Sequence, residues 1–143
     1  MPDIYNLQRF VYAQKNDYAV ALSEIQNGRK RSHWMWYIFP QVQGLGFSEM
    51  SKHYAIKNSD EAKAYLAHPV LGKRLAEISN ALLSLQANNA TSVLGSPDDV
   101  KLKSCMTLFA SLPDADGLFR KVLDKFFAGK EDKATLEKLR NAG

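Results

Sequence analysis

Cysteine and histidine are scarce in this sequence of 143 residues, which contains one cysteine and three histidines. The single Cys105 cannot form an internal disulfide, which suits a reducing compartment such as the cytoplasm. His33, His53 and His68 lie too far apart in sequence to form a local pair of metal ligands. The sequence therefore predicts a cytoplasmic protein, and we expect no metal site in it.

Long apolar runs are also missing. The longest, residues 34–39, is far shorter than the roughly 20 residues that a membrane-spanning helix needs. Residues 1–9 contain no basic region followed by an apolar stretch, so no signal peptide is expected. Gly44-Leu45-Gly46 lacks the third glycine and the preceding strand of a dinucleotide-binding loop. We therefore expect neither a membrane partner nor a cofactor.

Charge of one sign is not concentrated in the chain. The 19 basic and 15 acidic residues give a net charge of +4. A dedicated nucleic-acid binder is usually more basic, and more locally so, and we do not expect nucleic acid as a partner. The hydrophobic share of 45% is typical of a soluble globular domain, and the length fits one domain over residues 1–143.

Sustained period-two alternation is absent, which argues against a β-sheet. Apolar residues instead recur at helical spacings of three and four, most clearly in Leu71, Leu75, Ile78, Leu82 and Leu85. The sequence therefore predicts an all-α fold, a compact single-domain bundle of about seven to eight helices with irregular loops.

Cap and turn residues divide the chain into its expected helices. Asp17 is predicted to cap the second helix, and Ser59 is predicted to cap a later one. Ser96-Pro97-Asp98-Asp99 predicts another helix start, with the serine as cap and the proline in the first turn. A loop is expected over residues 41–47 and a turn over residues 113–117.

One stretch, residues 29–41, joins a basic run to a dense aromatic one and contains both tryptophans of the protein. Periodicity does not separate a buried helix from a strand here, and we favour a short buried helix that Pro40 ends. On a helix, Trp34 and Trp36 project about 200° apart and cannot both face one cavity. We expect one of them in the core and the other free to stack on a ring.

Candidate binding residues are polar or aromatic side chains in segments otherwise built as core. Lys30 and Arg31 beside an aromatic wall can hold a phosphate or carboxylate, and the amides of Gln14 and Gln41 can read the edge of a base. The alternative is that each makes a structural hydrogen bond, and that His68 caps a helix. The full set comprises Gln14, Lys30, Arg31, Trp34, Trp36, Gln41, His68, Lys101, Ser104 and Thr107.

The candidate catalytic residues are Asp98, Asp99 and His33. Asp98 shares a buried helical stripe with Leu102 and Cys105. A carboxylate in that position must have a charged or hydrogen-bonding partner, or take part in function. Either aspartate can stabilise an oxocarbenium-like centre or activate water. Cations before His33 and aromatics after it favour its neutral form, which suits a general base. Alternatively, the aspartates only complement the helix dipole and His33 only bonds to backbone.

Two functional hypotheses and a structural one follow. In the first, the protein binds a phosphorylated nucleoside-like small molecule and hydrolyses an N-glycosidic bond. In the second, Arg29, Lys30 and Arg31 with exposed aromatics form a non-catalytic module for a protein or a single-stranded nucleic acid. In the third, the stretch is core. Trp36 discriminates between the first two, as a pocket wall or as part of a solvent-facing patch.

Several longer motifs carry a resemblance to a known family. They include residues 7–11 with 13–14, residues 28–41, Gly44-Leu45-Gly46, residues 64–66 with 68–72, and residues 97–99 with 101–102 and 106–109. With these motifs the chain resembles the domain-of-unknown-function family numbered eighteen hundred and ten, over nearly its whole length. The resemblance implies a compact all-α fold, often in bacterial cytoplasm, and no settled activity. Some members carry a calpastatin label, which does not suit a folded helical domain because calpastatin-type inhibitors are disordered.

A second similarity concerns residues 10–15 alone, Phe-Val-Tyr-Ala-Gln-Lys. This segment is similar to the aromatic-x-x-Ala-Gln-Lys helix of the family named for NAD and ADP-ribose (NADAR). That family acts on N-glycosidic bonds of ADP-ribose-type compounds, so the similarity implies the same class of chemistry. The glutamate-bearing segment and the Trp-Gly motif of that family have no residue-by-residue match here.

Overall fold

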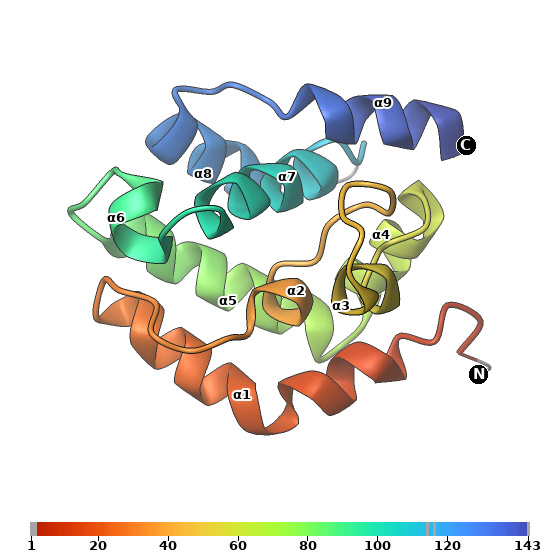
Figure 1. Cartoon of the computed structure of the whole chain (residues 1–143), viewed down its shortest axis with the longest axis horizontal. Coiled ribbons are helices and arrows are strands. Elements are labelled where there is room, and N and C mark those ends of the chain that lie inside the picture. The colour runs from red at the N-terminus through yellow and green to blue at the C-terminus, as the bar shows by residue number, and fades with distance from the viewer. Residues whose placement is uncertain (1–2, 114, 116, 143) are drawn as a thin grey trace.

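The computed structural model describes residues 3–113, 115 and 117–142, and nine helices lie within these ranges (Figure 1). They are α1 (Gln8–Gln26), α2 (Met35–Ile38), α3 (Glu49–His53), α4 (Ser59–Ala67), α5 (Leu71–Ser84), α6 (Ala90–Leu94), α7 (Asp98–Ala110), α8 (Leu118–Phe127) and α9 (Lys133–Ala142). The described ranges contain no strand, and an isolated bridge pairs Val42 with Ile56. The predicted all-α class is confirmed.

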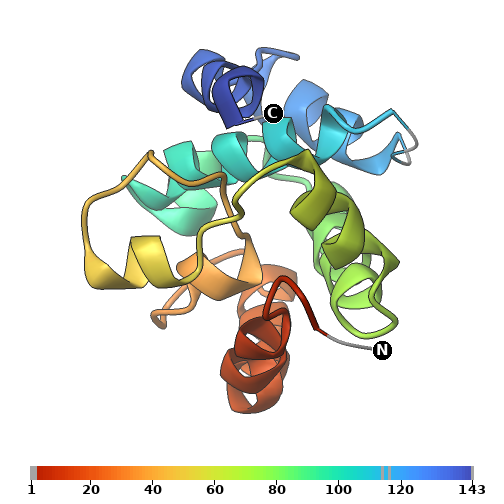
Figure 2. The same ribbon diagram turned by 90° about the vertical axis from the view of Figure 1, so that its right-hand side faces the viewer.

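α5 and α7 form the centre of the molecule. α5 packs against α1, α4 and α8, whereas α7 packs against α4, α6, α8 and α9. The predicted apolar stripe of α5 faces this core, since its first four leucine and isoleucine side chains are buried: Leu71, Leu75, Ile78 and Leu82. The view in Figure 2 places α3 and α5 on opposite sides of the molecule. α3 and the loop before it therefore lie on the face that Figure 1 presents to the viewer.

The predicted helix caps at Asp17 and Ser59 are wrong. α1 runs unbroken through Asp17, because nothing between its two apolar stripes is a proline or glycine that would end it. The Asp17 carboxylate instead accepts a hydrogen bond from the hydroxyl of Tyr37. In α4 the cap is Asn58, one residue earlier than predicted, and its side chain accepts from the backbone N–H of Glu61 at 2.9 Å. The short α6 was not predicted, although its cap is a typical one, since the Asn89 side chain accepts from the N–H groups of Thr91 and Ser92.

The start of α7 differs from its prediction as well. Pro97 occupies the N-cap position and no side chain caps the helix from there, so Ser96 is not the cap. Backbone and first-turn groups satisfy the free N–H groups instead. The N–H of Asp99 donates to the carbonyl of Gly95 at 2.9 Å, and the Asp99 carboxylate accepts from the N–H of Val100. Asp98 and Asp99 lie in the first turn as predicted.

The basic-aromatic stretch folds as expected. α2 is a short helix with mostly buried side chains, and it ends before Pro40. Residues 41–47 form the predicted loop, anchored by the bridge between Val42 and Ile56. The predicted turn over residues 113–117 includes residues 114 and 116, which lie outside the described residues. Among the helices described, none has the length and apolarity that crossing a membrane requires.

Candidate functional site

The loop between α1 and α2 is organised by one carboxylate, that of Glu24. Its Oε1 accepts hydrogen bonds from the N–H of Arg31 at 2.8 Å, the N–H of Ser32 at 3.0 Å and the indole N–H of Trp34 at 2.9 Å. Its Oε2 accepts from the hydroxyl of Ser32 at 2.6 Å. Burial acts to raise the pKa of Glu24, but these hydrogen bonds outweigh it and lower the pKa to about 2.

Glu24 was not among the predicted site residues, although an acidic side chain near the end of α1, just before a basic run, was a usable signal. Its effect is to fix Trp34, whose indole is only 2% exposed. The backbone N–H of Lys30 adds a hydrogen bond of 2.7 Å to the carbonyl of Val93 in α6. The chain from residue 30 to α2 is therefore held at both ends, and its side chains are presented in a fixed arrangement.

These side chains form most of the wall of a cleft between α2, α3 and the first turn of α7. Its volume is ≈ 190 Å³. The cleft is lined by Lys30, His33, Trp34, Met35, Trp36, Tyr37, Met50, Asp98 and Lys101. Six of the predicted site residues meet here, although the aspartate and one lysine come from a segment far along the chain.

The centre of the cleft is a cluster of three charged groups. Oδ2 of Asp98 lies 2.9 Å from Nζ of Lys30, and its Oδ1 lies 3.1 Å from Nζ of Lys101. The side chains of Lys30 and Asp98 are 9% and 16% exposed. Partial burial acts to raise the pKa of Asp98, but the two ammonium groups lower it below its usual range. The carboxylate is therefore ionised, and the cluster carries a net positive charge.

Both ammonium groups also lie near an indole ring. Nζ of Lys30 is 5.1 Å from the ring centroid of Trp34, and Nζ of Lys101 is 4.1 Å from that of Trp36. Trp34 is buried whereas Trp36 is half-buried at the cleft. Trp34 is the N-cap residue before α2, with a φ of −140°, so the helical angle expected between the two rings does not apply. Both rings line the cleft, Trp34 from the core and Trp36 as the partly exposed wall, and the expectation that they cannot face one cavity is wrong.

His33 and Tyr37 complete the rim. The His33 side chain is exposed, and its backbone carbonyl accepts a hydrogen bond of 3.2 Å from the Tyr37 hydroxyl. The same hydroxyl donates to Asp17. Burial and the neighbouring Asp17 carboxylate raise the pKa of Tyr37. Tyr37 is therefore a neutral structural donor at neutral pH, and a general-base role for His33 stays a prediction.

Gln14 lies in the core, outside the cleft. Its Nε2 donates to the carbonyl of Tyr37 at 2.7 Å and contacts the hydroxyl of Tyr65 at 3.1 Å. Its Oε1 accepts from Arg74 at 3.3 Å. Both polar atoms of this amide have partners within the protein, so Gln14 makes structural hydrogen bonds.

Three other predicted binding residues also make structural contacts away from the cleft. Nδ1 of His68 accepts from two backbone N–H groups at the start of α5, at 3.1 and 3.2 Å, and so caps that helix. The hydroxyl of Ser104 donates to Asp132 at 3.1 Å, and that of Thr107 accepts from the Asp132 N–H at 2.9 Å. These two side chains tie α7 to the start of α9.

Arg31, Asp99 and Gln41 also lie outside the lining of the cleft. Arg31 is exposed. The Asp99 carboxylate accepts from the hydroxyl of Thr91 at 2.6 Å and joins α6 to α7. Gln41 is buried, and its Nε2 has no hydrogen-bond partner among the described residues.

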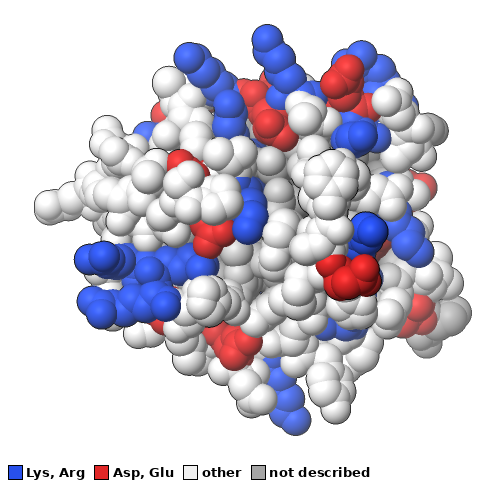
Figure 3. Space-filling model, viewed as in Figure 1, with Lys and Arg blue, Asp and Glu red and all other residues white. Residues whose placement is uncertain are grey.

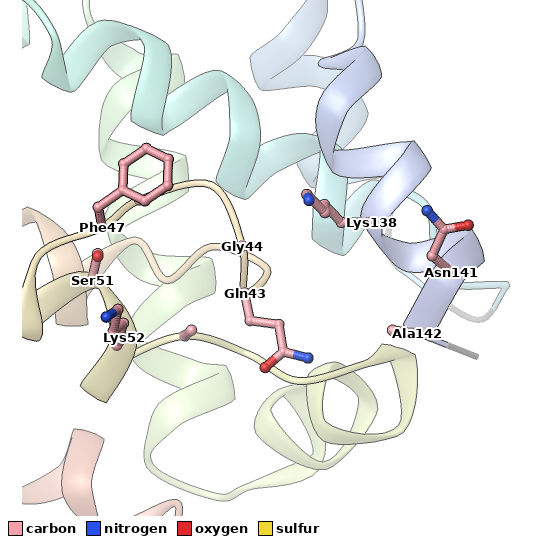
Figure 4. Close-up of a pocket in the computed structure, with 10 residues that line it drawn as sticks. Gln43, Gly44, Phe47, Ser51, Lys52, Lys138, Asn141 and Ala142 are labelled. Carbon is pink, nitrogen blue, oxygen red and sulfur yellow. The ribbon is translucent and has the colours of Figure 1, made fainter.

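A larger cavity, of ≈ 490 Å³, lies on the same face between loop 43–47, α3 and the end of α9 (Figure 4). In that view Lys138 and Asn141 belong to α9, and Phe47 lies across the cavity from them. Its lining comprises Gln43, Gly44, Gly46, Phe47, Ser51, Lys52, Ala55, Lys138, Asn141 and Ala142. From the sequence, only the glycine-containing loop of this cavity was predicted. The rest of the lining combines residues 43–55 with residues 138–142, and segments so far apart in the chain share no local pattern.

Comparison with known proteins identifies the family but no activity. A solved structure, that of the conserved hypothetical protein Rv1873 from Mycobacterium tuberculosis, is 44% identical and superposes with a TM-score of 0.94. The match covers 96% of this chain and 99% of that one. No curated protein matches, and the similarity to the NADAR family is not shown. A family model described as Protein of unknown function (DUF1810) matches residues 4–139, and the chain therefore belongs to the DUF1810 family.

Proposed function

We propose that the cleft of Lys30, Asp98 and Lys101 binds a small molecule with an anionic group and a ring, of the phosphorylated nucleoside class. The observation that carries this proposal is the convergence of two lysines on one carboxylate beside the half-buried ring of Trp36. Partly buried charges are expensive to maintain, and they occur more often at functional sites than elsewhere.

The chemistry of the lysines fits an anion. Each ammonium group has three donors, and Asp98 engages one donor of Lys30 and one of Lys101. A phosphate or carboxylate accepts from the remaining donors and neutralises the net positive charge of the cluster. The ring of the ligand then lies against Trp36, where stacking adds affinity.

The size of the cleft limits the ligand. Pockets for drug-sized molecules usually measure about 300–1,000 Å³, and this cleft measures ≈ 190 Å³. It therefore fits one ring or one phosphate with its near neighbours, and a dinucleotide would extend beyond it. Trp36 lies in the wall of a cleft and not on a flat exposed patch, which supports the small-molecule hypothesis over the alternative of a protein- or nucleic-acid-binding module in this stretch.

Hydrolysis of an N-glycosidic bond is the second part of the hypothesis. The lowered pKa of Asp98 suits a carboxylate that orients lysines or faces a developing positive charge, and it does not suit a proton donor. His33 at the rim is the remaining candidate for activating water. The binding proposal does not depend on this step.

Intrinsic fluorescence tests the binding proposal, since both tryptophans of the chain line the cleft. Titration with adenosine monophosphate should change the emission of the wild type, and Trp36→Phe should remove most of that change. Lys101→Met should weaken binding about tenfold, because it removes a charged hydrogen bond. The control is Lys121→Met, an exposed lysine of α8 outside the cleft, which should bind like the wild type. Unchanged emission, together with no thermal stabilisation by adenosine monophosphate or inorganic phosphate, would contradict the proposal.

Turnover is measured in the same samples. Chromatography of the mixture after long incubation detects free base released from adenosine monophosphate or nicotinamide mononucleotide. Release that His33→Ala abolishes while binding persists would support the hydrolytic hypothesis. Binding without release would leave a binding protein.

A further inference from the structure

A second site is formed by two adjoining cavities on the face that carries α3. The ≈ 490 Å³ cavity of Figure 4 has a neighbour of ≈ 270 Å³. Gln43, Lys52 and Ala55 line both cavities, which therefore adjoin and are together called the groove. The groove runs from the end of α9, past loop 43–47 and α3, to the segment before α1.

The charges along this groove have one sign. Its lining contains five basic or titratable cationic side chains and no carboxylate: Arg9, Lys52, His53, Lys57 and Lys138. The rest of this face is mixed, since Figure 3 shows Asp and Glu beside several of the Lys and Arg patches. The groove is thus a local basic strip on a protein of modest net charge.

Three of these cations are available to a ligand. Arg9 is already engaged, because its guanidinium pairs with Glu61 at 2.8 Å and donates to backbone carbonyls. No ion pair involves Lys52, Lys57 or Lys138 within the described ranges. All three are exposed, so binding an anion costs little desolvation.

The shape of the groove is set by backbone. Gly44 has a φ of +94°, a conformation that other residues rarely adopt, and it lies under the side chain of Lys138. A Cβ at this position would lie 3.1 Å from Cε of Lys138. The loop can therefore pass close to the side chain of Lys138, which lines the cavity.

An exposed apolar ring also lines the groove. Phe47 lines the larger cavity and is 90% exposed, so it makes little use of its apolar surface in the free protein. Tyr5 lines the smaller cavity and is half-buried. Gln43 and Asn141 add amide donors and acceptors between the cations.

From this arrangement we propose that the groove binds single-stranded nucleic acid. Lys52, Lys57 and Lys138 contact successive phosphates, and one base stacks on Phe47. Cations spaced along a groove together with an exposed aromatic ring are the combination that such ligands require. The site is separate from the cleft of Lys30, Asp98 and Lys101, and it stands independently of the function proposed for that cleft. This proposal differs from the expectation, based on net charge, that nucleic acid is not a partner.

Fluorescence anisotropy of a fluorescein-labelled oligouridylate of eight nucleotides tests the proposal. Binding should weaken with salt, with a slope of log K against log salt of about −2 for three contacts to a single strand. The double variant Lys52→Glu/Lys138→Glu should bind at least about tenfold more weakly and reduce the slope by about 1.4, since each contact contributes about 0.7. Phe47→Ala should weaken binding about tenfold with an unchanged slope.

Two variants serve as controls. Lys121→Glu changes the charge by the same amount per site but lies outside the groove, and Lys101→Met alters only the cleft. Both variants should bind the oligonucleotide about as well as the wild-type protein does. An unchanged anisotropy on titration, or an equal loss in Lys121→Glu, would overturn the proposal. Equal competition by inorganic tripolyphosphate, with no effect of Phe47→Ala, would also overturn it, because the groove would then recognise phosphate alone.

Discussion

Lys30 and Asp98 join two distant parts of the chain through an ion pair in which Nζ and Oδ2 are 2.9 Å apart. Lys30 belongs to the loop that Glu24 organises, and Asp98 is the first residue of α7. The pair therefore connects the rigid basic-aromatic stretch to the central helix. The cleft exists because these two segments meet, and its charge is set by the second lysine, Lys101, on the same carboxylate.

Asp98→Asn should destabilise the protein and strengthen anion binding. The substitution leaves two ammonium groups close together without a counterion. We expect a loss of about 1–3 kcal/mol in the free energy of unfolding, less than the 3–5 kcal/mol of a fully buried pair because this cluster is partly exposed. The freed ammonium groups should bind inorganic phosphate more tightly. Urea unfolding and calorimetric titration with phosphate measure the two effects.

Asp99→Asn is the matched control, because Asp99 lies in the same helical turn but bonds to Thr91 and not to the lysines. It should leave the phosphate affinity unchanged. If Asp98→Asn instead abolished phosphate binding in a folded protein, Asp98 would have to position the lysines for the anion, and the description of it as a competing counterion would be wrong.

Glu24 should make the protein acid-sensitive. Its pKa is about 2 in the folded protein, against an ordinary value of 4.5. A lowered folded-state pKa adds stability that is complete above the unfolded pKa, and this stability is lost as the pH falls from about 5 towards 2. Glu24→Gln keeps an oxygen that accepts hydrogen bonds but removes the titration. The variant should therefore show a smaller change in urea midpoint between pH 6 and pH 3 than the wild type.

The matched control for this experiment is Glu137→Gln, which removes an exposed carboxylate of α9. It should reproduce the pH dependence of the wild type. A Glu24→Gln variant with the full wild-type loss between pH 6 and pH 3 would mean that other carboxylates carry the acid sensitivity.

The sequence identified most of the helices and the central part of the site, because both depend on local pattern. The apolar stripe of α5 repeats every three or four residues. Pro40 prevents α2 from continuing, whatever tertiary contacts that helix makes. Residues 29–41 place cationic side chains next to aromatic side chains that need burial. A binding site at the edge of the core was therefore expected in this stretch. Asp98 was found because a carboxylate on an apolar stripe needs a partner.

Several of the missed features depend on contacts between distant segments. Asp17 was expected to cap a helix, whereas its partner Tyr37 lies beyond the end of α1. Gln14 was placed in a ligand site because its partners, Tyr65 among them, come from other helices. The basic groove combines Lys52 with Lys138, which no spacing rule relates. Local propensity specifies each helix, but packing decides which polar groups meet.

Gln14→Leu should reduce stability without a specific effect on the cleft. The substitution preserves most of the volume but removes the donors to Tyr37 and Tyr65 and leaves a buried carbonyl unsatisfied. We expect a loss of about 1–3 kcal/mol in the free energy of unfolding, measured with urea. The control Gln8→Leu, at an exposed position of α1, should be nearly neutral. A stable Gln14→Leu protein with impaired ligand binding would return Gln14 to the binding set.

Gly72→Ala should be among the most damaging small substitutions in the chain. Gly72 lies in the first turn of α5, where a Cβ would come within 2.0 Å of the backbone carbonyl oxygen of Leu66 in α4. That atom belongs to a helix and cannot rotate away, so the two helices would have to separate. Overpacking usually costs about 1–3 kcal/mol, and we expect a loss at or above the upper end of that range.

Gly117→Ala gives the matched comparison, because its Cβ would meet no atom within 4 Å and its φ is −61°. Alanine there should be neutral or stabilise by about 0.4–1 kcal/mol, since it restricts the unfolded chain at no steric cost. Thermal and urea unfolding of the two variants side by side separate the close approach of α4 and α5 from the general effect of replacing a glycine. Equal stabilities for Gly72→Ala and Gly117→Ala would mean that α4 and α5 do not approach as closely as the Leu66 carbonyl and Gly72 indicate.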